Sequence, residues 1–340
     1  MNMLKKQDTL IERGMKTILD QYETGKINLA ETMRFLNHDQ SIQNVNLDIP
    51  NTSIQEIYQE LDQLIGLAEV KSLVREIFSF LQIQNQRKLN GLLSDALVLH
   101  MIFKGNPGTG KTTVARVFGR MFKEMNILSK GHMIEVERAD LVGEYIGHTA
   151  QKTREQIKKA LGGILFIDEA YSLNRGGEKD FGKEAIDTLV KGMEDYKNEF
   201  ILILAGYSEE IDNFLMSNPG LPSRFPININ FPDYTITELM DIAELMLEER
   251  QYKFTFKARL KLRNQLERNH QLRNQNFSNA RFVRNLIEKA IRKQATRLIR
   301  ENQASLLSRS ELMMISDLDI ETTGGTSNDR ILNYREKRSW

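Results

Sequence analysis

Residues 105 to 113 read Gly105-Asn106-Pro107-Gly108-Thr109-Gly110-Lys111-Thr112-Thr113. An apolar run over residues 98–103 precedes this stretch, and a helical pattern with hydrophobic residues on one face follows it. A strand, a glycine-rich loop and an amphipathic helix in this order are the context that a phosphate-binding P-loop requires. Glycines let successive backbone N–H groups point into one concavity, and the first turn of the helix adds unpaired N–H groups. The sequence therefore predicts a nucleoside triphosphate site formed by these nine residues.

Two side chains of this loop have specific predicted roles. The ammonium group of Lys111 is expected to bridge the β- and γ-phosphates, and the hydroxyl group of Thr112 is expected to bind Mg²⁺. An ordinary glycine turn is the alternative interpretation. That turn would need neither the strand before the loop nor the helix after it, so the context favours phosphate binding.

A second landmark is the acidic pair Asp168-Glu169, which follows the apolar residues Ile164-Leu165-Phe166-Ile167. Four consecutive apolar residues predict a central parallel strand that is buried on both faces. Carboxylates at the end of such a strand lie where open α/β sheets bind their ligands. We expect Asp168 to help hold Mg²⁺ and Glu169 to act as the general base toward the attacking water. A helix cap is the alternative for this pair.

The order of the predicted elements indicates the fold class. Strands alternate with helices across residues 98–231, which predicts an α/β domain with a doubly wound parallel sheet. Only helical patterns follow, with Thr237 as the expected cap of the first helix. We expect an N-terminal helical extension and linker over 1–55, a nucleotide-binding domain over 56–234, an all-helical domain over 235–316 and a mobile tail over 317–340.

Two segments before the P-loop are less specific. Ile65 and Gly66 lie in a break between two predicted helices, one helix upstream of the P-loop, and are candidates for the wall that contacts adenine. The first 55 residues are either a recruitment segment or a packing appendage, and the sequence favours the second.

Composition excludes several classes of function. The 340 residues allow two or three domains, and a net charge of +1 gives no general attraction to nucleic acid or to a membrane surface. The absence of cysteine excludes disulfides and thiolate chemistry and fits a reducing compartment. No apolar run has the length of a signal peptide or of a membrane span. We therefore expect a soluble, cytoplasmic protein without a membrane partner.

Positive charge is concentrated near the C-terminal end of the chain. Residues 250–310 contain 16 Lys or Arg and only 3 Asp or Glu. Such a segment can bind nucleic acid or can face acidic surfaces of neighbouring subunits. The arginines are not interleaved with aromatic residues as in a single-strand binding platform, which makes nucleic acid the less favoured partner.

These features together resemble the AAA+ ATPases. The stretches 103–112, 139–153, 162–173 and 218–234 are similar to the CbbX branch of that family, and the resemblance covers roughly residues 60–316. It implies a ring, with six subunits expected, that hydrolyses ATP with Mg²⁺ at each subunit boundary. It also implies that the ring remodels a protein client through a central pore and that the protein acts in bacterial spore formation.

The resemblance assigns roles to individual residues. Lys111 and Thr112 match the Walker A motif, and Asp168 and Glu169 match Walker B. Arg224, in a proline-rich loop, matches the arginine finger that reaches the γ-phosphate of a neighbour. Residues alone leave Arg224 equally open to interpretation as an ordinary surface arginine.

Three further assignments follow from the same resemblance. Tyr145-Ile146-Gly147 matches the pore loop of ring translocases, in which an aromatic and an aliphatic side chain grip a polypeptide. Arg281 matches the second sensor, although Arg284, one turn along the same helix, is an alternative. Tyr207 takes the position where many AAA+ proteins have the asparagine that orients the lytic water, so the first-sensor role is open between Tyr207 and the neighbouring Ser208.

Two other functions stay open at this point. One is a nucleic-acid-stimulated ATPase of the clamp-loader type, suggested by the basic C-terminal segment. The other is a nucleotide-gated scaffold that hydrolyses ATP too slowly for mechanical work. The residues do not specify the client protein.

Overall fold

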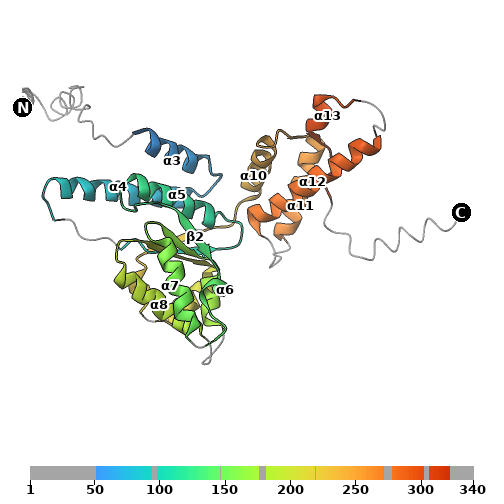
Figure 1. Ribbon diagram of the computed structural model, residues 1–340. Coiled ribbons are helices and arrows are strands. Elements are labelled where there is room, and N and C mark those ends of the chain that lie inside the picture. Colours follow the sequence, from blue (N-terminus) through green and yellow to red (C-terminus); the bar gives the residue numbers. More distant parts are fainter. Residues whose placement is uncertain are drawn as a thin grey trace, which may run out of the picture. The chain divides into compact units, whose positions relative to one another are not determined.

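The computed structural model describes residues 51–93, 98–145, 147–175, 181–218, 220–271, 278–301 and 306–321 (Figure 1). The predicted extension up to residue 50 and the predicted tail from residue 322 onward lie outside the described residues. The tail prediction therefore stays a prediction for most of its length.

Five parallel strands form the central sheet. They are β1 (Met101–Gly105), β2 (Met133–Val136), β3 (Ile164–Ile167), β4 (Ile201–Gly206) and β5 (Ile227–Phe231). Their spatial order is β2-β3-β4-β1-β5, and every neighbouring pair is parallel. The predicted doubly wound sheet is confirmed, and the P-loop strand β1 lies between β4 and β5 rather than at an edge.

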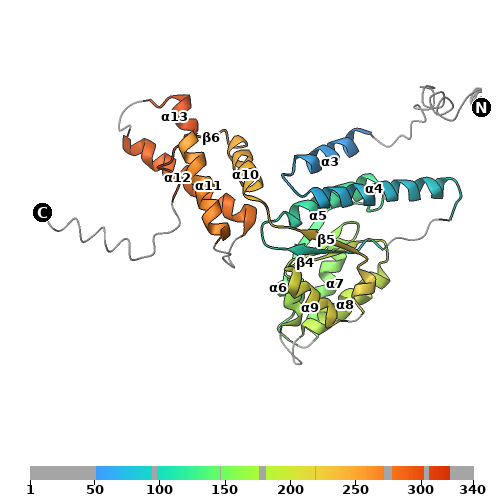
Figure 2. The same cartoon turned by 180° about the vertical axis from the view of Figure 1, so that it is seen from behind.

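Helices cover both faces of this sheet (Figures 1 and 2). Before the sheet come α3 (Asn51–Gln63) and α4 (Ala68–Leu89). The connections within the sheet contain α5 (Lys111–Glu124), α6 (Arg138–Leu141), α7 (His148–Ala160), α8 (Gly182–Asp195), α9 (Ser208–Met216) and the 3₁₀ helices η2 (Ala170–Asn174) and η4 (Pro222–Arg224). In both views α4 and α5 lie on one side of the sheet, and α7 and α8 lie on the other.

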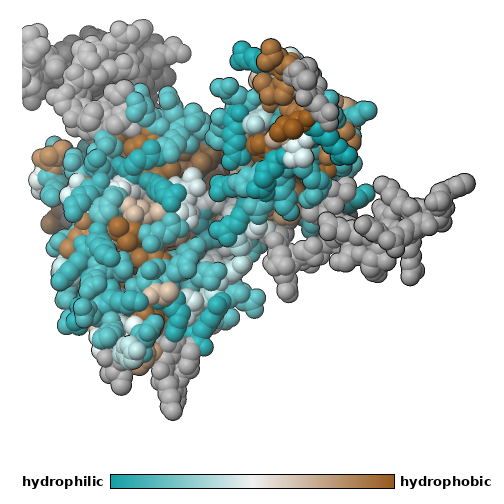
Figure 3. Space-filling view, turned by 45° about the vertical axis from the view of Figure 1, so that its right-hand side comes forward, coloured by the Kyte–Doolittle hydropathy of each residue, from teal (hydrophilic) through white to brown (hydrophobic). Residues whose placement is uncertain are grey.

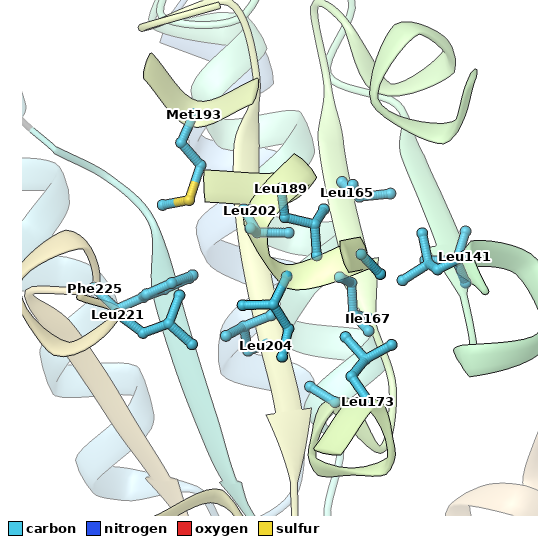
Figure 4. Close-up of a cluster of buried hydrophobic side chains, with 14 of the residues drawn as sticks. Leu141, Leu165, Ile167, Leu173, Leu189, Met193, Leu202, Leu204, Leu221 and Phe225 are labelled. Carbon is cyan, nitrogen blue, oxygen red and sulfur yellow. The ribbon is translucent and has the colours of Figure 1, made fainter. Parts of the chain in front are cut away.

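The alternation of side chains along the strands divides the core into two layers. Phe103 of β1 points toward α5, where its ring centroid is 6.2 Å from that of Phe118, and it lies 6.3 Å from the ring of Phe166 on β3. Leu165 and Leu202, on the opposite face, belong to the cluster that packs against α7, α8 and α9 (Figure 4). Both faces of the central strands are buried, as the unbroken apolar runs predict. This rigid base holds the carboxyl ends of the strands in place.

A helical domain follows the sheet. It contains α10 (Ile236–Glu248), α11 (Phe256–Gln271), α12 (Asn279–Glu301) and α13 (Arg309–Met313). The short strands β6 (Lys253–Phe254) and β7 (Met314–Ile315) pair in parallel within it, which the sequence pattern did not indicate. The expected cap at Thr237 is wrong. Thr235 is the N-cap of α10, and its hydroxyl group accepts a hydrogen bond from the backbone N–H of Glu238 in a reciprocal capping box.

The helical domain extends a few residues past the expected boundary at residue 316. Asp319 is only 1% exposed, and its carboxylate accepts two hydrogen bonds from the guanidinium group of Arg297, at 2.8 and 2.9 Å. Ile320 is also buried. This packing attaches residues 317–320 to α12.

The described surface is largely hydrophilic. On the face shown in Figure 3, hydrophilic side chains predominate and hydrophobic ones gather in smaller, separate areas. Among the described residues, no helix combines the length and the apolar character that a membrane span needs.

Candidate active site

The P-loop folds tightly at the carboxyl end of β1. Gly108 has a φ angle of 72°, in the left-handed region that favours glycine. A Cβ atom at this position would also collide with the backbone carbonyl oxygen of Ser278, just before α12. Only glycine therefore permits both this turn and the close approach of α12.

The first turn of α5 is open to an anion. Gly110 is its N-cap residue and has no side chain to satisfy the first N–H groups of the helix. Those N–H groups and the positive end of the helix dipole favour a bound phosphate. Lys111 begins the helix, and its Nζ atom donates hydrogen bonds to the carbonyl oxygens of Gly105 and Asn106, both at 2.8 Å. Burial lowers the pKa of the Lys111 ammonium group, and the nearby Asp168 carboxylate opposes that shift.

The acidic pair emerges from β3 beside this loop. One carboxylate oxygen of Asp168 accepts a hydrogen bond from the backbone N–H of Glu169 at 3.0 Å. Glu169 has a φ angle of 48°, so the chain turns sharply at this residue and leaves its side chain exposed. The turn gives the two neighbouring carboxylates different directions and surroundings.

A single cavity of about 450 Å³ joins these groups. Most of the predicted nucleotide-site residues line it: Ile65, Gly105, Pro107, Gly108, Gly110, Lys111, Thr112, Thr113, Asp168, Glu169, Tyr207 and Arg281, together with the alternative Arg284. The cavity also has an apolar part, formed by Leu64 and Leu67 and by the α10 residues Ile242, Leu245 and Met246. Polar groups for phosphates and an apolar wall for a base thus share one space.

Three residues predicted to bind the nucleotide do not line this cavity. Gly66 lies against the side chain of Glu238. Asn106 donates from its Nδ2 atom to both carboxylate oxygens of Asp233, at 2.9 Å each. The hydroxyl group of the buried Thr109 donates to the carbonyl oxygen of Asn106 at 2.8 Å. The side chains of Asn106 and Thr109 thus hold the loop through hydrogen bonds to Asp233 and within the loop itself.

Tyr207 lies at the end of β4 as the N-cap of α9. Burial raises the pKa of its phenol group, and the carboxylate of Glu169 raises it further. The ring of Tyr171 is 6.0 Å from that of Tyr207, and burial together with Glu169 raises the pKa of Tyr171 to about 12. Both phenols therefore stay protonated near the general-base candidate, where each can donate a hydrogen bond. Tyr171 was not anticipated, because its position inside η2 carries no motif.

Arg224 lies at the opposite end of the strands from the P-loop. It ends η4, just before β5 begins, and its guanidinium group pairs with Glu194 of α8 and donates to the carbonyl oxygen of Gly220 at 2.6 Å. It borders a different cavity, of about 530 Å³, together with His100 and Phe200, which precede β1 and β4. This cavity is at the amino ends of the strands, whereas the P-loop and the acidic pair are at their carboxyl ends.

The predicted pore loop connects α6 to α7. Tyr145 is 66% exposed, and its ring meets that of His148 edge-on at a centroid distance of 5.6 Å. Gly147 is the N-cap of α7, with a φ angle of 84°. Ile146 lies outside the described residues. An aromatic ring thus projects into solvent beside a conformationally permissive glycine.

The donors available to a divalent cation are oxygen atoms. The hydroxyl group of Thr112 and the carboxylate of Asp168 both line the nucleotide cavity. In the described part of the chain, no three His, Asp or Glu side chains cluster as a metal site. Mg²⁺ is commonly held by one or two protein oxygens together with substrate phosphates and water, so this sparse set fits Mg²⁺ and does not fit a dedicated metal centre.

The chain matches a known protein family and is similar to characterised relatives. Residues 101–233 match the family described as "ATPase family associated with various cellular activities (AAA)", and residues 235–330 match the AAA lid domain. "Stage V sporulation protein K" of Bacillus subtilis is 59% identical over 268 residues, which cover 78% of this chain and 82% of that relative.

The chain is also similar to a second relative and to a solved structure. The chloroplastic ribulose bisphosphate carboxylase/oxygenase activase of Cyanidioschyzon merolae is 44% identical over 284 residues, covering 82% of this chain and 96% of the activase. The crystal structure of the FIGL-1 AAA domain in complex with ADP aligns with a TM-score of 0.51 at 15% identity, covering 81% of this chain and 89% of that one. The last comparison supports the fold alone.

Proposed function

The chain belongs to the CbbX branch of the AAA ATPases and is an ATP hydrolase, and from this we propose that it works as a ring that remodels a protein client. In this proposal the triphosphate lies against the P-loop and the start of α5. Lys111 contacts the β- and γ-phosphates, and Thr112 and Asp168 hold Mg²⁺, which neutralises phosphate charge when bound. The apolar wall with Ile65 accepts the base.

Hydrolysis is assigned to groups around the same cavity. Glu169 orients and deprotonates the attacking water, and the phenol of Tyr207 donates a hydrogen bond to that water or to a phosphate oxygen. The position of Tyr207 on the wall of the same cavity as Glu169 supports this role, and a phenol is a hydrogen-bond donor at neutral pH. Arg281 approaches the phosphates from the start of α12.

The position of Arg224 is the observation that best supports assembly into a ring. Negative charge spreads over the phosphoryl oxygens in the transition state and is stabilised by a cation such as an arginine. Arg224 borders the cavity at the amino ends of the strands, so it is remote from the phosphate site of its own subunit. A second copy placed head to tail would bring Arg224 to that site, and head-to-tail contacts generate rings when the rotation closes. We expect six subunits.

The proposed mechanical element is the loop at residues 145–147. The exposed ring of Tyr145 offers apolar contact to any extended polypeptide, and Gly147 allows the loop to change direction. The relative named for activation of a carboxylase supports a protein client, and the relative named for stage V of sporulation supports a role in bacterial spore formation.

A nucleic-acid partner is the second candidate, because residues 250–310 are strongly basic. Several of those charges are already paired within the helical domain: Arg259 with Glu244, Arg263 with Glu267 and Arg297 with Asp319. Pairing reduces the charge available to a phosphate backbone. ATP turnover that rises with DNA or RNA at low salt would favour this second function.

Client capture tests the proposal. Glu169→Gln should retain ATP without hydrolysing it, so that a client engaged by the loop stays bound through affinity purification. The same variant with Tyr145→Ala should lose that client, whereas Tyr145→Phe, which keeps the ring, should retain it. Equal recovery with and without the aromatic ring at position 145 would exclude threading through this loop.

A further inference from the structure

Two segments contact the outer side of the P-loop, one just before the helical domain and one within it. The first is Asp233-Tyr234, which connects β5 to α10, and the second is Asn279, the first residue of α12. Asn279 is completely buried. Its Oδ1 atom accepts a hydrogen bond from the backbone N–H of Tyr234 at 3.0 Å, and its Nδ2 atom donates to a carboxylate oxygen of Asp233 at 2.7 Å. This one amide side chain therefore joins the two segments.

The same groups continue onto the P-loop itself. The Nδ2 atom of Asn279 also lies 3.3 Å from the carbonyl oxygen of Pro107, to which it donates. The backbone N–H of Ala280 donates to the carbonyl oxygen of Gly108 at 3.2 Å. The hydroxyl group of Tyr234 donates to the carbonyl oxygen of Thr109, also at 3.2 Å. Three consecutive P-loop carbonyl groups thus accept hydrogen bonds from Tyr234 and from the first two residues of α12.

The side chain at position 279 must meet three demands at once. Its φ angle is 46°, in the left-handed region that asparagine tolerates better than most residues. It must accept one hydrogen bond from Tyr234 and donate to the carboxylate of Asp233. Glycine would satisfy the φ angle without either hydrogen bond, and aspartate would place a second acceptor against Asp233. Asparagine alone among the short side chains supplies the conformation, the acceptor and the donor.

We propose that Asn279 and Asp233 form a clasp that fixes the start of α12 to the P-loop and thereby positions Arg281 for ATP hydrolysis. Arg281 follows Asn279 by two residues and lines the nucleotide cavity. Its own side chain is long and exposed, so the geometry of its backbone decides where the guanidinium group can reach. Asn279 and Asp233 are positioning residues that act through Arg281. The inference rests on the proposed function only for the role of Arg281.

A swap of the donor and the acceptor tests the clasp in the full-length protein. Asn279→Asp should lower kcat by on the order of tenfold, the value of one hydrogen bond to a charged group, with a smaller change in KM. Asp233→Asn alone should have a milder effect, because an amide at 233 can still accept from Asn279. The double variant restores a donor facing an acceptor between positions 233 and 279 but not the hydrogen bond to Pro107, so it should recover part of the lost kcat. If Asn279→Asp lost activity only because the protein unfolds, the second substitution would not restore kcat.

Glu267→Gln provides the matched control. It removes an exposed charge that pairs with Arg263 within α11, outside the clasp, and should leave turnover and unfolding unchanged. A kcat of Asn279→Asp equal to that of this control, in a protein that unfolds like the wild type, would overturn the proposal. Additive losses in the double variant would overturn it as well.

A distance measurement separates the clasp from the role of Arg281. The chain has no cysteine, so cysteines introduced at the exposed positions Leu89 and Ile299 can carry spin labels without further changes. The distance distribution should be narrow in the wild type, broad in Asn279→Asp and narrow again in the double variant. If Arg281→Ala leaves turnover intact while these distributions behave as expected, the sensor role fails and the clasp stands. Unchanged distributions in all variants would contradict the clasp itself.

Discussion

Glu169 and Asp168 are adjacent in sequence but face different surroundings, because the chain turns at Glu169 with a φ angle of 48°. The carboxylate of Asp168 is held by the backbone N–H of Glu169, while Glu169 itself lies exposed near two protonated phenols. These two acidic residues could be proposed from the sequence, because phosphate binding with Mg²⁺ and activation of water require carboxylates at the end of such a strand. Asn279 was not predictable as part of the site. Its partner Asp233 is 46 positions away, and no local pattern links the two residues.

Removal of the proposed general base should separate binding from hydrolysis. Glu169→Gln keeps the size and polarity of the side chain but cannot accept the proton of the attacking water. ATP turnover should fall by at least about 100-fold, the usual contribution of a general base, while the affinity for ATP changes little. Lys111→Ala is the contrasting variant and should lose affinity. Turnover of Glu169→Gln within about twofold of the wild type would favour the slow scaffold.

A buried histidine should make the sheet sensitive to acid. Burial lowers the pKa of His100 from 6.5 to about 4, and its Nδ1 atom accepts a hydrogen bond from the backbone N–H of Leu202 at 3.0 Å. The folded state therefore resists protonation that the unfolded state accepts below pH 6.5. The stability supplied by the neutral ring is complete above pH 6.5 and is lost as the pH falls toward 4.

Urea unfolding at two pH values measures this effect. Between pH 7 and pH 4.5 the wild type should lose about 2 kcal/mol more unfolding free energy than His100→Asn, which keeps an acceptor but cannot be protonated in this range. His148→Asn, at an exposed histidine, should follow the wild type. Equal acid sensitivity of His100→Asn and the wild type would show that His100 does not titrate on unfolding.

At the scale of elements, periodicity predicted the strands and their order of alternation with helices. The apolar run of β3 indicated a central strand, and both β3 and β4 are buried along their whole length. The cap of α10 was misplaced by two residues, because Thr235 and Thr237 both suit an N-cap and only the contact with Glu238 distinguishes them. The pairing of β6 with β7 was not predictable, since two-residue strands carry no period.

The pair between α12 and residue 319 should contribute strongly to the stability of the helical domain. Asp319 is buried, and its hydrogen bonds from Arg297 and Ser316 outweigh the opposing effect of burial and lower the pKa of its carboxyl group. Its stabilising contribution is therefore present above pH 3.8 and is lost as the pH falls below that value.

Asp319→Asn should lower the unfolding free energy by about 2 kcal/mol at pH 7, because Arg297 loses a charged partner with two good hydrogen bonds. Lys293→Gln, which breaks an exposed pair with Glu321, should cost less than about 0.5 kcal/mol. Denaturant titration of both variants makes the comparison. Equal effects of the two substitutions would show that the buried pair has no special weight.

At the scale of the whole molecule, the fold places the groups proposed for hydrolysis at opposite ends of the parallel strands. The P-loop and the acidic pair lie at the carboxyl ends of the strands, and Arg224 lies at the amino ends. The P-loop and the acidic pair were predicted from their motifs, and Arg224 was predicted from the resemblance to the family. The sequence could not predict this separation, because the direction and the order of strands depend on contacts that are distant along the chain.

Mixing two inactive variants tests the central claim that one subunit hydrolyses ATP with an arginine from its neighbour. Lys111→Ala lacks a functional P-loop and Arg224→Ala lacks the arginine, so each alone should be nearly inactive. An equal mixture, shown by native mass spectrometry to co-assemble, should recover roughly a quarter of wild-type turnover, since random head-to-tail contacts pair an intact P-loop with an intact Arg224 that often. A co-assembled mixture whose rate stays at the average of the two separate variants would contradict the shared site.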